Sequence, residues 1–224
     1  MPLARACYTA RVIPYGALLF DMDGLMVDSE PAWFELQSEF AGARGGTWNT
    51  DLARRCVGGG LVNALRVMHE TFGFEVDVER DMATMMDMFV ARVDRLELKR
   101  GLLDLLNAAC AGNVPCAVAS SSSRRLVDAT LNRFGIRDRF GAIVTGDAVA
   151  RPKPAPDIFL EAGRRLGAPP AACVVLEDSL AGVRAGRAAN MYVIAVPEAA
   201  DDAFAGLADA VVPDLSFAQR LLSL

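Results

Sequence analysis

The sequence has no closely spaced pair of cysteines and no apolar run of the roughly 18 residues that a membrane span needs. Its first twenty residues are interrupted by Arg5, Arg11 and Pro14, so we expect neither a signal peptide nor a membrane anchor. Without a C-x-x-C motif, we interpret the cysteines as reduced core thiols of a cytoplasmic protein. There are five of them: Cys7, Cys56, Cys110, Cys116 and Cys173.

Basic residues are also scarce. The 224 residues include 23 Lys and Arg against 28 Asp and Glu, giving a net charge of -5, which argues against a nucleic-acid or membrane-surface partner. The one histidine, His69, lies in a helical pattern, and we expect it on a surface, not as a base. The hydrophobic content of 53% and the mean hydropathy of +0.26 indicate a folded chain with one main core.

Short apolar runs recur along the chain and predict strands at residues 17–20, 116–120, 142–145, 173–177, 192–196 and 210–212. Helical patterns lie between most of them, at 122–135, 155–167 and 179–190, and end in Gly135, Gly167 and Asn190, residues typical of helix C-caps. Alternating strands and helices predict an α/β, Rossmann-like fold, in which a parallel sheet carries helices on both faces.

Residues 30–99 break this alternation. Amphipathic helical patterns cover 31–42, 61–73 and 79–100, with no comparable strand run between them. The sequence therefore predicts a helical domain, 30–99, inserted into a core domain made of 1–29 and 100–224. The joints would lie near Ser29, a predicted helix N-cap followed by Pro31 in the first turn, and near Arg100-Gly101.

Polar side chains follow four of the predicted strands, where a parallel sheet collects its ligands. They are Asp21 and Asp23 in "FDMDG", Ser120 in "VASSS", Lys153 in "RPKPAP", and Glu177 and Asp178 in "VLEDS". Clustered acids repel one another unless a cation neutralises them, and oxygen ligands beside an open position suit Mg²⁺. The sequence therefore predicts a magnesium site at this edge of the sheet.

Such a site favours phosphoryl chemistry. With Mg²⁺ and Lys153 holding the phosphate oxygens, a strand-end carboxylate can attack phosphorus and form an aspartyl-phosphate. A second carboxyl group two residues later can protonate the departing alkoxide and afterwards activate water.

The motifs "FDMDG", "VASSS", "KPAPDIF" and "LEDSLAG", in this order, resemble the four motifs of the haloacid dehalogenase superfamily, and the match covers nearly the whole chain. The resemblance implies Asp21 as nucleophile and Asp23 as general acid/base. It implies phosphate binding by Ser120 and Lys153, beside Ser121 and Gly24. It also implies a Mg²⁺ site made of Asp21, the Asp23 carbonyl and Asp178, with Glu177 nearby.

The insert resembles the helical cap of the superfamily's phosphatase and β-phosphoglucomutase-like branch, which closes over the site and reads the substrate beyond its phosphate. "FDMDGLMVDSEPAW" is similar to small sugar and polyol phosphate phosphatases of that branch, and implies that Asp28 and Glu30 lie at the hinge end of the site. β-Phosphoglucomutase relatives offer a histidine and an arginine where this chain has Trp33 and Leu61. Because a mutase needs cationic cap groups, we favour hydrolysis.

Structural alternatives accompany each of these residues. "FDMDG" alone is typical of a turn or a Ca²⁺ loop, and Ser120–Ser123 could cap the next helix. Lys153 could be a solvated loop residue. Glu177, more than Asp178, could cap a helix that begins near Ser179.

The cap leaves alternatives open too. "GGG" at 58–60 lacks the Lys-Ser/Thr of a nucleotide P-loop and is interpreted as a turn facing substrate, with Asn63 a substrate contact. Trp33 is either cap core or a wall of the substrate pocket. Met82, Met85, Met86 and Met88 form either the packed face of a helix or an adaptable pocket.

The sequence thus predicts a Mg²⁺-dependent phosphatase that hydrolyses a sugar, deoxysugar or polyol monophosphate through a phosphorylated Asp21, acting as a monomer or weak homodimer. A phosphomutase is the alternative among enzymes. A protein that holds an aspartyl-phosphate as a signal is the alternative among binding modules, although Asp23 is placed to hydrolyse that phosphate.

Overall fold

The computed structural model describes residues 16–56, 60–199 and 202–224. A six-stranded sheet in the order β5-β4-β1-β6-β7-β8 forms the centre of the molecule, and every pair of neighbours in it is parallel. The six predicted apolar runs are these strands. They are β1 (Ala17–Phe20), β4 (Cys116–Ser120), β5 (Ala142–Thr145), β6 (Cys173–Glu177), β7 (Tyr192–Ala195) and β8 (Ala210–Val211).

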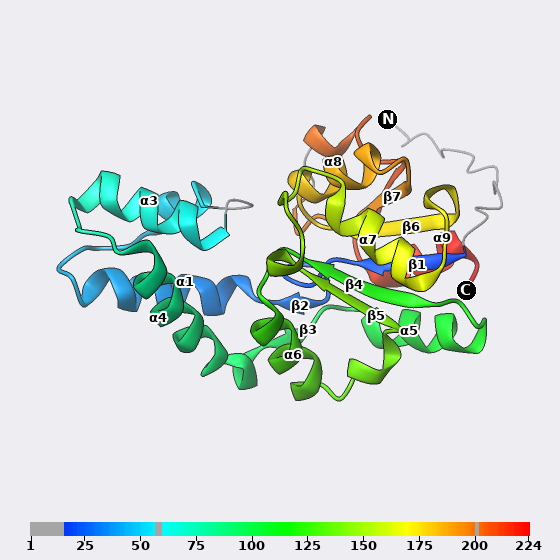
Figure 1. The fold of residues 1–224 in the computed structure, drawn as a ribbon, viewed down its shortest axis with the longest axis horizontal. Coiled ribbons are helices and arrows are strands. Elements are labelled where there is room, and N and C mark those ends of the chain that lie inside the picture. The colour runs from blue at the N-terminus through cyan, green and yellow to red at the C-terminus, as the bar shows by residue number, and fades with distance from the viewer. Residues whose placement is uncertain (1–15, 57–59, 200–201) are drawn as a thin grey trace, which may run out of the picture.

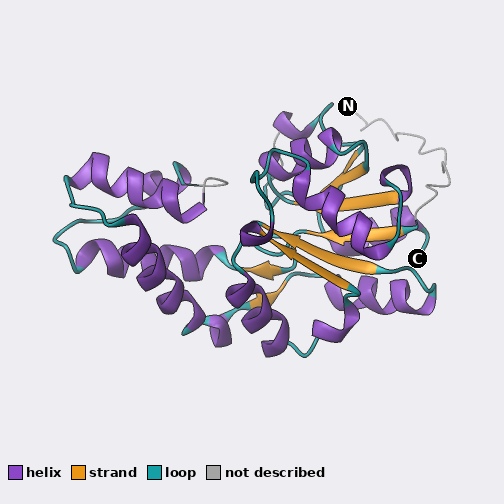
Figure 2. Ribbon diagram, in the orientation of Figure 1, coloured by secondary structure: helices purple, strands orange, loops and turns teal. Residues whose placement is uncertain are grey.

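Helices cover both faces of the sheet, as predicted (Figure 2). One face packs on α5 (Leu102–Ala111), α6 (Arg124–Arg133) and α9 (Leu215–Leu222), and the other packs on α7 (Asp157–Leu166) and α8 (Leu180–Ala188). Alternate residues of β1 serve the two layers, since Leu18 and Phe20 belong to the first core and Ala17 and Leu19 to the second. This double burial explains the unbroken apolar runs.

The predicted helix ends are confirmed. Gly167 is the left-handed C-cap of α7, with φ +71°. Gly135 and Asn190 lie just beyond the ends of α6 and α8 and also have positive φ, +64° and +57°. Each turns the chain back toward the next strand.

The cap helices extend away from one end of the sheet (Figure 1). They are α1 (Glu30–Gly42), α2 (Thr50–Arg54), α3 (Gly60–Phe72) and α4 (Val78–Val90). Two short strands, β2 (Val27–Asp28) and β3 (Glu97–Leu98), pair antiparallel and carry the chain into and out of the cap. Ser29 precedes α1 as predicted, but its side chain makes no capping hydrogen bond.

The prediction of a helix over 79–100 was wrong beyond Val90. There α4 ends, a 3-10 turn follows at Val93–Arg95 (η1), and the chain becomes extended in β3. Its partner β2 lies 69 or more residues earlier, at Val27 and Asp28, so the strand depends on a pairing that helical periodicity does not report. A two-residue strand also gives no alternation of its own.

The cap also contacts the core beside α6. Arg125 of α6 pairs with Asp87 of α4, and Arg133 Nε lies 3.1 Å from Asp94 Oδ1. Helices α4 and α6 accordingly lie side by side in Figure 1. The cap is therefore held at the β2–β3 ribbon and along one helix.

The expectation of core thiols holds for Cys116 and Cys173, which are buried, whereas Cys56 is half-buried and Cys110 exposed. All four are free, and Cys7 lies outside the described residues. His69 is exposed, as predicted. In the part of the chain that the structure describes, no helix is long and apolar enough to cross a membrane.

Candidate active site

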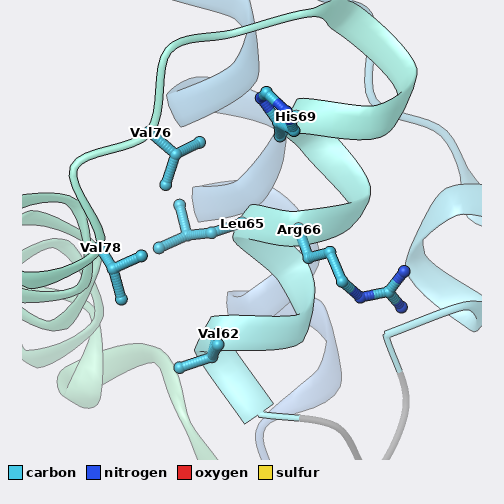
Figure 3. Close-up of a pocket in the computed structure, with 6 residues that line it drawn as sticks. All are labelled: Val62, Leu65, Arg66, His69, Val76 and Val78. Atoms are coloured by element: carbon cyan, nitrogen blue, oxygen red, sulfur yellow. The ribbon is translucent and has the colours of Figure 1, made fainter.

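A cavity of about 830 Å³ lies between the carboxyl ends of the strands and the cap helices. It contains every predicted strand-end group, together with side chains from α1, α2 and α4. A smaller hollow of about 380 Å³ lies on the cap, where α3 faces the segment leading into α4 (Figure 3). Its lining includes none of the strand-end acids, so we place the candidate site in the larger cavity.

Lys153 lies between two carboxylates at the bottom of this cavity. Its Nζ donates to Asp21 Oδ1 and, at 2.7 Å, to Glu177 Oε1, and its side chain is 5% exposed. Burial alone would lower the pKa of Lys153, but the charges of Asp21 and Glu177 outweigh burial and raise it. The lysine is therefore a fixed positive charge and not a solvated loop residue.

Asp21 and Asp178 carry more negative charge than this one lysine balances. Burial raises the pKa of Asp21 to about 7, although Lys153 opposes the rise. Burial, followed by the charges of Glu177 and Asp21, raises the pKa of Asp178 well above its ordinary value. Glu177 belongs to the same group, since one carboxylate oxygen from each of Asp21, Glu177 and Asp178 lies within 4.8 Å of the others. Such a group is stable as carboxylates only with a further cation.

The backbone around these acids allows the loops that carry them to approach one another closely. A Cβ on Gly24 would lie 2.1 Å from Asp178 Oδ2, and Gly24 has φ +83°, so glycine allows the first loop to approach Asp178 closely. All of the donors are hard oxygens, which fit Mg²⁺. The residues present therefore fit the predicted metal.

Glu177 also has the structural role that the sequence left open. Its Oε2 accepts from the Ser179 backbone N–H at 2.7 Å and from the Ser179 hydroxyl at 2.9 Å. Ser179 in turn caps α8 by accepting from the Gly182 N–H at 3.1 Å. Glu177 is thus held by Lys153 and by the start of α8. Asp21 and Asp178 are therefore the carboxylates more available to bind a cation.

Asp23 is suited to carry a proton. Burial raises its pKa, while the Ser122 hydroxyl, which donates to Oδ2 at 2.7 Å, and more weakly Ser29 and Trp33, lower it. Its Oδ1 is buried and has no partner at ordinary hydrogen-bond geometry among the residues that the structure describes. A buried carboxyl oxygen without a partner favours the protonated form, which can donate to a substrate oxygen.

The serine loop after β4 completes the core side of the cavity. Ser120 is buried, and its Oγ accepts from the Ser122 N–H at 3.1 Å, which shapes the loop. Ser121 lies against Gly146, where a Cβ would approach the Ser121 carbonyl oxygen to 2.2 Å. Ser120 and Ser121 both line the cavity, and their role as phosphate ligands stays a prediction.

The family model of haloacid dehalogenase-like hydrolases matches residues 18–196 of the chain. The protein belongs to this family. The fructose-1-phosphate phosphatase YqaB of Escherichia coli is 31% identical over 186 residues, which are 81% of this chain and 96% of that protein. Hexitol phosphatase B of E. coli is 29% identical over 219 residues, covering 89% and 92% of the two chains.

Two further comparisons concern length and fold. The bifunctional riboflavin kinase/FMN phosphatase of Arabidopsis thaliana is 33% identical over 181 residues, but this chain spans only 48% of that protein's length. The crystal structure of CbbY from Rhodobacter sphaeroides with phosphate has a TM-score of 0.80 at 28% identity and covers 94% of this chain and 100% of its own. The fold of this haloacid dehalogenase-like hydrolase is therefore shared by solved relatives, and several of its homologues, including YqaB and hexitol phosphatase B, are phosphatases.

The cap side of the cavity agrees only partly with the sequence expectations. Trp33 meets both descriptions offered for it, because it packs on Phe89 with ring centroids 4.0 Å apart and also lines the cavity. Asn63 does not line it: its amide donates to the Arg55 carbonyl at 2.9 Å and accepts from Arg66 at 2.6 Å. We therefore leave Asn63 out of the proposed site.

The methionines of α4 are divided between the two roles. Met82 and Met86 line the cavity, Met85 is fully buried in the cap, and Met88 packs against the core cluster. In the glycine loop, Gly60 lines the cavity, and the preceding residues 57–59 lie outside the described part of the chain.

The cavity also contains residues that were not singled out from the sequence, among them Ser122, Arg54 and Gln37. Ser122 was one of four consecutive serines, and only the structure shows which of them contacts Asp23. Arg54 lies at the cavity, paired with Asp51 at 3.0 Å, so the cap has a cation just before the glycine loop. Gln37 gave no signal beyond its place one helical turn after Trp33.

Proposed function

We propose that this haloacid dehalogenase-like hydrolase is a phosphatase acting on a small phosphorylated sugar or polyol through a covalent phosphate on Asp21. The juxtaposition of Asp21, paired with Lys153, and Asp23, with an unpartnered oxygen, carries this proposal. The two E. coli relatives named for fructose 1-phosphate and hexitol phosphates support the substrate class. The free cysteines support the predicted reducing, cytoplasmic setting.

In the first half of the reaction, Asp21 attacks phosphorus as its carboxylate. The bond from phosphorus to the ester oxygen breaks while Asp23 transfers its proton to that oxygen, so that a neutral alcohol leaves. Lys153 holds the carboxylate in place and offsets part of the charge that accumulates on the phosphoryl oxygens.

In the second half, Asp23 is ionised and accepts a proton from water as that water attacks the phosphorus of the Asp21-phosphate. Ser122 stabilises this ionised form through its 2.7 Å hydrogen bond. The products are inorganic phosphate and the original pair of carboxyl groups, so the cycle balances in protons.

Asp21, Asp178 and the Asp23 carbonyl would hold Mg²⁺, with Glu177 beside them. When bound, the ion neutralises the acids and polarises the phosphoryl group. We further propose that residues 30–99 form the cap, which excludes water from the reacting groups and contacts the leaving group. Gly24 and Ser121 would contact the phosphate beside Ser120 and Lys153.

The test is phosphate release from a panel of sugar, polyol, nucleotide and glycolate phosphates, with Mg²⁺ and with EDTA. We expect metal-dependent turnover that Asp21→Asn abolishes and Asp23→Asn lowers by at least about 100-fold. Asp104→Asn, the same change at an exposed position of α5, serves as the control and should retain activity.

Two results would contradict the proposal. No turnover of any monoester would exclude the phosphatase function. Turnover that requires an added sugar bisphosphate, with no net phosphate release, would indicate a phosphomutase instead.

A further inference from the structure

The cap half of the active-site cavity has mostly apolar walls. Trp33 and Phe34 of α1, Leu61 of α3, and Met82 and Met86 of α4 all line it. Such walls suit the carbon-bearing faces of a leaving group, but they cannot by themselves distinguish one hydroxylated compound from another.

One buried polar side chain interrupts these walls. Gln37 of α1 lines the cavity at 7% exposure, whereas the other polar cap residues there, Glu30, Thr50 and Arg54, are exposed. Among the residues that the structure describes, no side chain or backbone group makes a hydrogen bond to the Gln37 amide. The residue is mostly buried, but its amide oxygen and nitrogen are open to the cavity, so a ligand there can supply the hydrogen-bond partner that the protein does not.

The place of Gln37 on α1 indicates which part of the ligand it meets. Trp33 lines the same cavity as Asp23, and α1 leads from β2 away from the sheet into the cap (Figure 1). Gln37 follows Trp33 by one helical turn, about 6 Å along the helix on the same face. Because Asp23 is the residue that protonates the ester oxygen in the proposed reaction, Gln37 lies beyond that oxygen, at the level of the leaving group.

We propose that Gln37 is the specificity residue of this cavity and that it hydrogen-bonds a hydroxyl group on the leaving group of the substrate. This inference rests on the proposed phosphatase function and narrows its substrate class. The preferred substrates are phosphate esters whose leaving group carries a hydroxyl on one side and an apolar carbon face against Trp33 on the other. A leaving group without a hydroxyl leaves the Gln37 amide unpaired in the complex and is therefore disfavoured.

The test compares Gln37→Met with wild type, because methionine keeps the length and unbranched shape of glutamine and removes its hydrogen bonds. Two substrates are used: the sugar or polyol phosphate with the highest kcat/KM in the panel, and p-nitrophenyl phosphate, whose leaving group has no hydroxyl besides the ester oxygen. We expect the ratio of their kcat/KM values to fall at least about 10-fold in the variant. Gln219→Met on α9, where the amide donates to the Leu224 carbonyl at 3.2 Å, is the matched control.

A ratio that stays the same would overturn the inference, whether both activities fall together or neither changes. Thermal unfolding of Gln37→Met shows whether the fold is intact. Gln37→Glu retains a hydrogen-bond acceptor on a side chain of the same length, so its ratio of kcat/KM values should stay closer to that of wild type than the ratio of Gln37→Met. Wild type that hydrolyses neither ester would overturn the proposed phosphatase function itself, and with it this inference. Wild type that hydrolyses both esters with an unchanged ratio in the variant would overturn the role of Gln37 alone.

Discussion

Replacing the nucleophile should stabilise the metal-free protein. In the absence of a cation, burial raises the pKa of Asp21 from its ordinary value of 3.8 to about 7. A carboxyl group whose pKa is higher in the folded protein stabilises the fold while both states are protonated. It loses that contribution as the pH rises through the folded pKa. Metal-free wild type is therefore destabilised at pH 8 by its own Asp21, and Asp21→Asn removes the effect.

The magnitude follows from the two pKa values. Each pH unit between them is worth about 1.4 kcal/mol, so the rise to about 7 corresponds to on the order of 4 kcal/mol at pH 8. At pH 5 the destabilisation by Asp21 is about a third as large, because only the interval between the unfolded pKa of 3.8 and the working pH contributes. For a chain of this size the full effect corresponds to a rise in Tm on the order of 10 °C.

The assay is urea unfolding in EDTA at pH 5 and at pH 8, for wild type, Asp21→Asn and the exposed control Asp104→Asn. We expect the asparagine variant at position 21 to exceed wild type in free energy of unfolding, and to do so by more at pH 8. Saturating Mg²⁺ should stabilise wild type more than the variant, because the ion compensates the charge that the variant lacks. The difference in free energy of unfolding between the two proteins should therefore become smaller. Asp21→Asn that is less stable than wild type at pH 8 in EDTA would refute the reasoning.

Two further substitutions test the loops around the acids. Gly24→Ala should raise the Mg²⁺ concentration for half-maximal activity about 10-fold and cost about 1–3 kcal/mol more in unfolding than Gly45→Ala. Both glycines have φ +83°, but only Gly24 has an atom, Asp178 Oδ2, at 2.1 Å from the added Cβ, and nothing lies within 4 Å at Gly45; equal effects would show that the contact is unimportant. Ser122→Ala removes the 2.7 Å hydrogen bond that stabilises ionised Asp23, so kcat should fall about 10-fold and acid-quenched enzyme should retain more covalent phosphate. An unchanged kcat and phosphate content would mean that Asp23 does not depend on this bond.

The main sheet could be predicted from the sequence because its strands are buried on both faces. The runs "ALLF" and "CVVL" contain no polar position, and each leads directly into acids of the candidate site. The strand-end acids could be placed together for the same reason, since the carboxyl ends of parallel strands share one edge.

The rest depended on contacts between distant segments. Strand β3 forms because Leu98 meets Val27, and no local pattern reports that pairing. Asn63 was expected at the substrate because it follows a glycine loop, but α3 starts at Gly60 and directs the amide to the Arg55 carbonyl. Gln37, in contrast, lines the cavity but could not be predicted to do so, because nothing in "FELQSEF" distinguishes a buried glutamine from an exposed one.

The spacing of the site along the chain has a consequence for folding. The contact between Lys153 and Asp21 spans 132 residues, and that between Ser122 and Asp23 spans 99. During synthesis, the first acids therefore emerge long before the lysine that compensates them, and pairing them requires closure of a long loop. The buried charges cannot assemble until β1, β4 and the segment before α7 are all in place. Ligand binding at this site therefore requires the completed core, and a chain that ends before Lys153 should not bind ligand there.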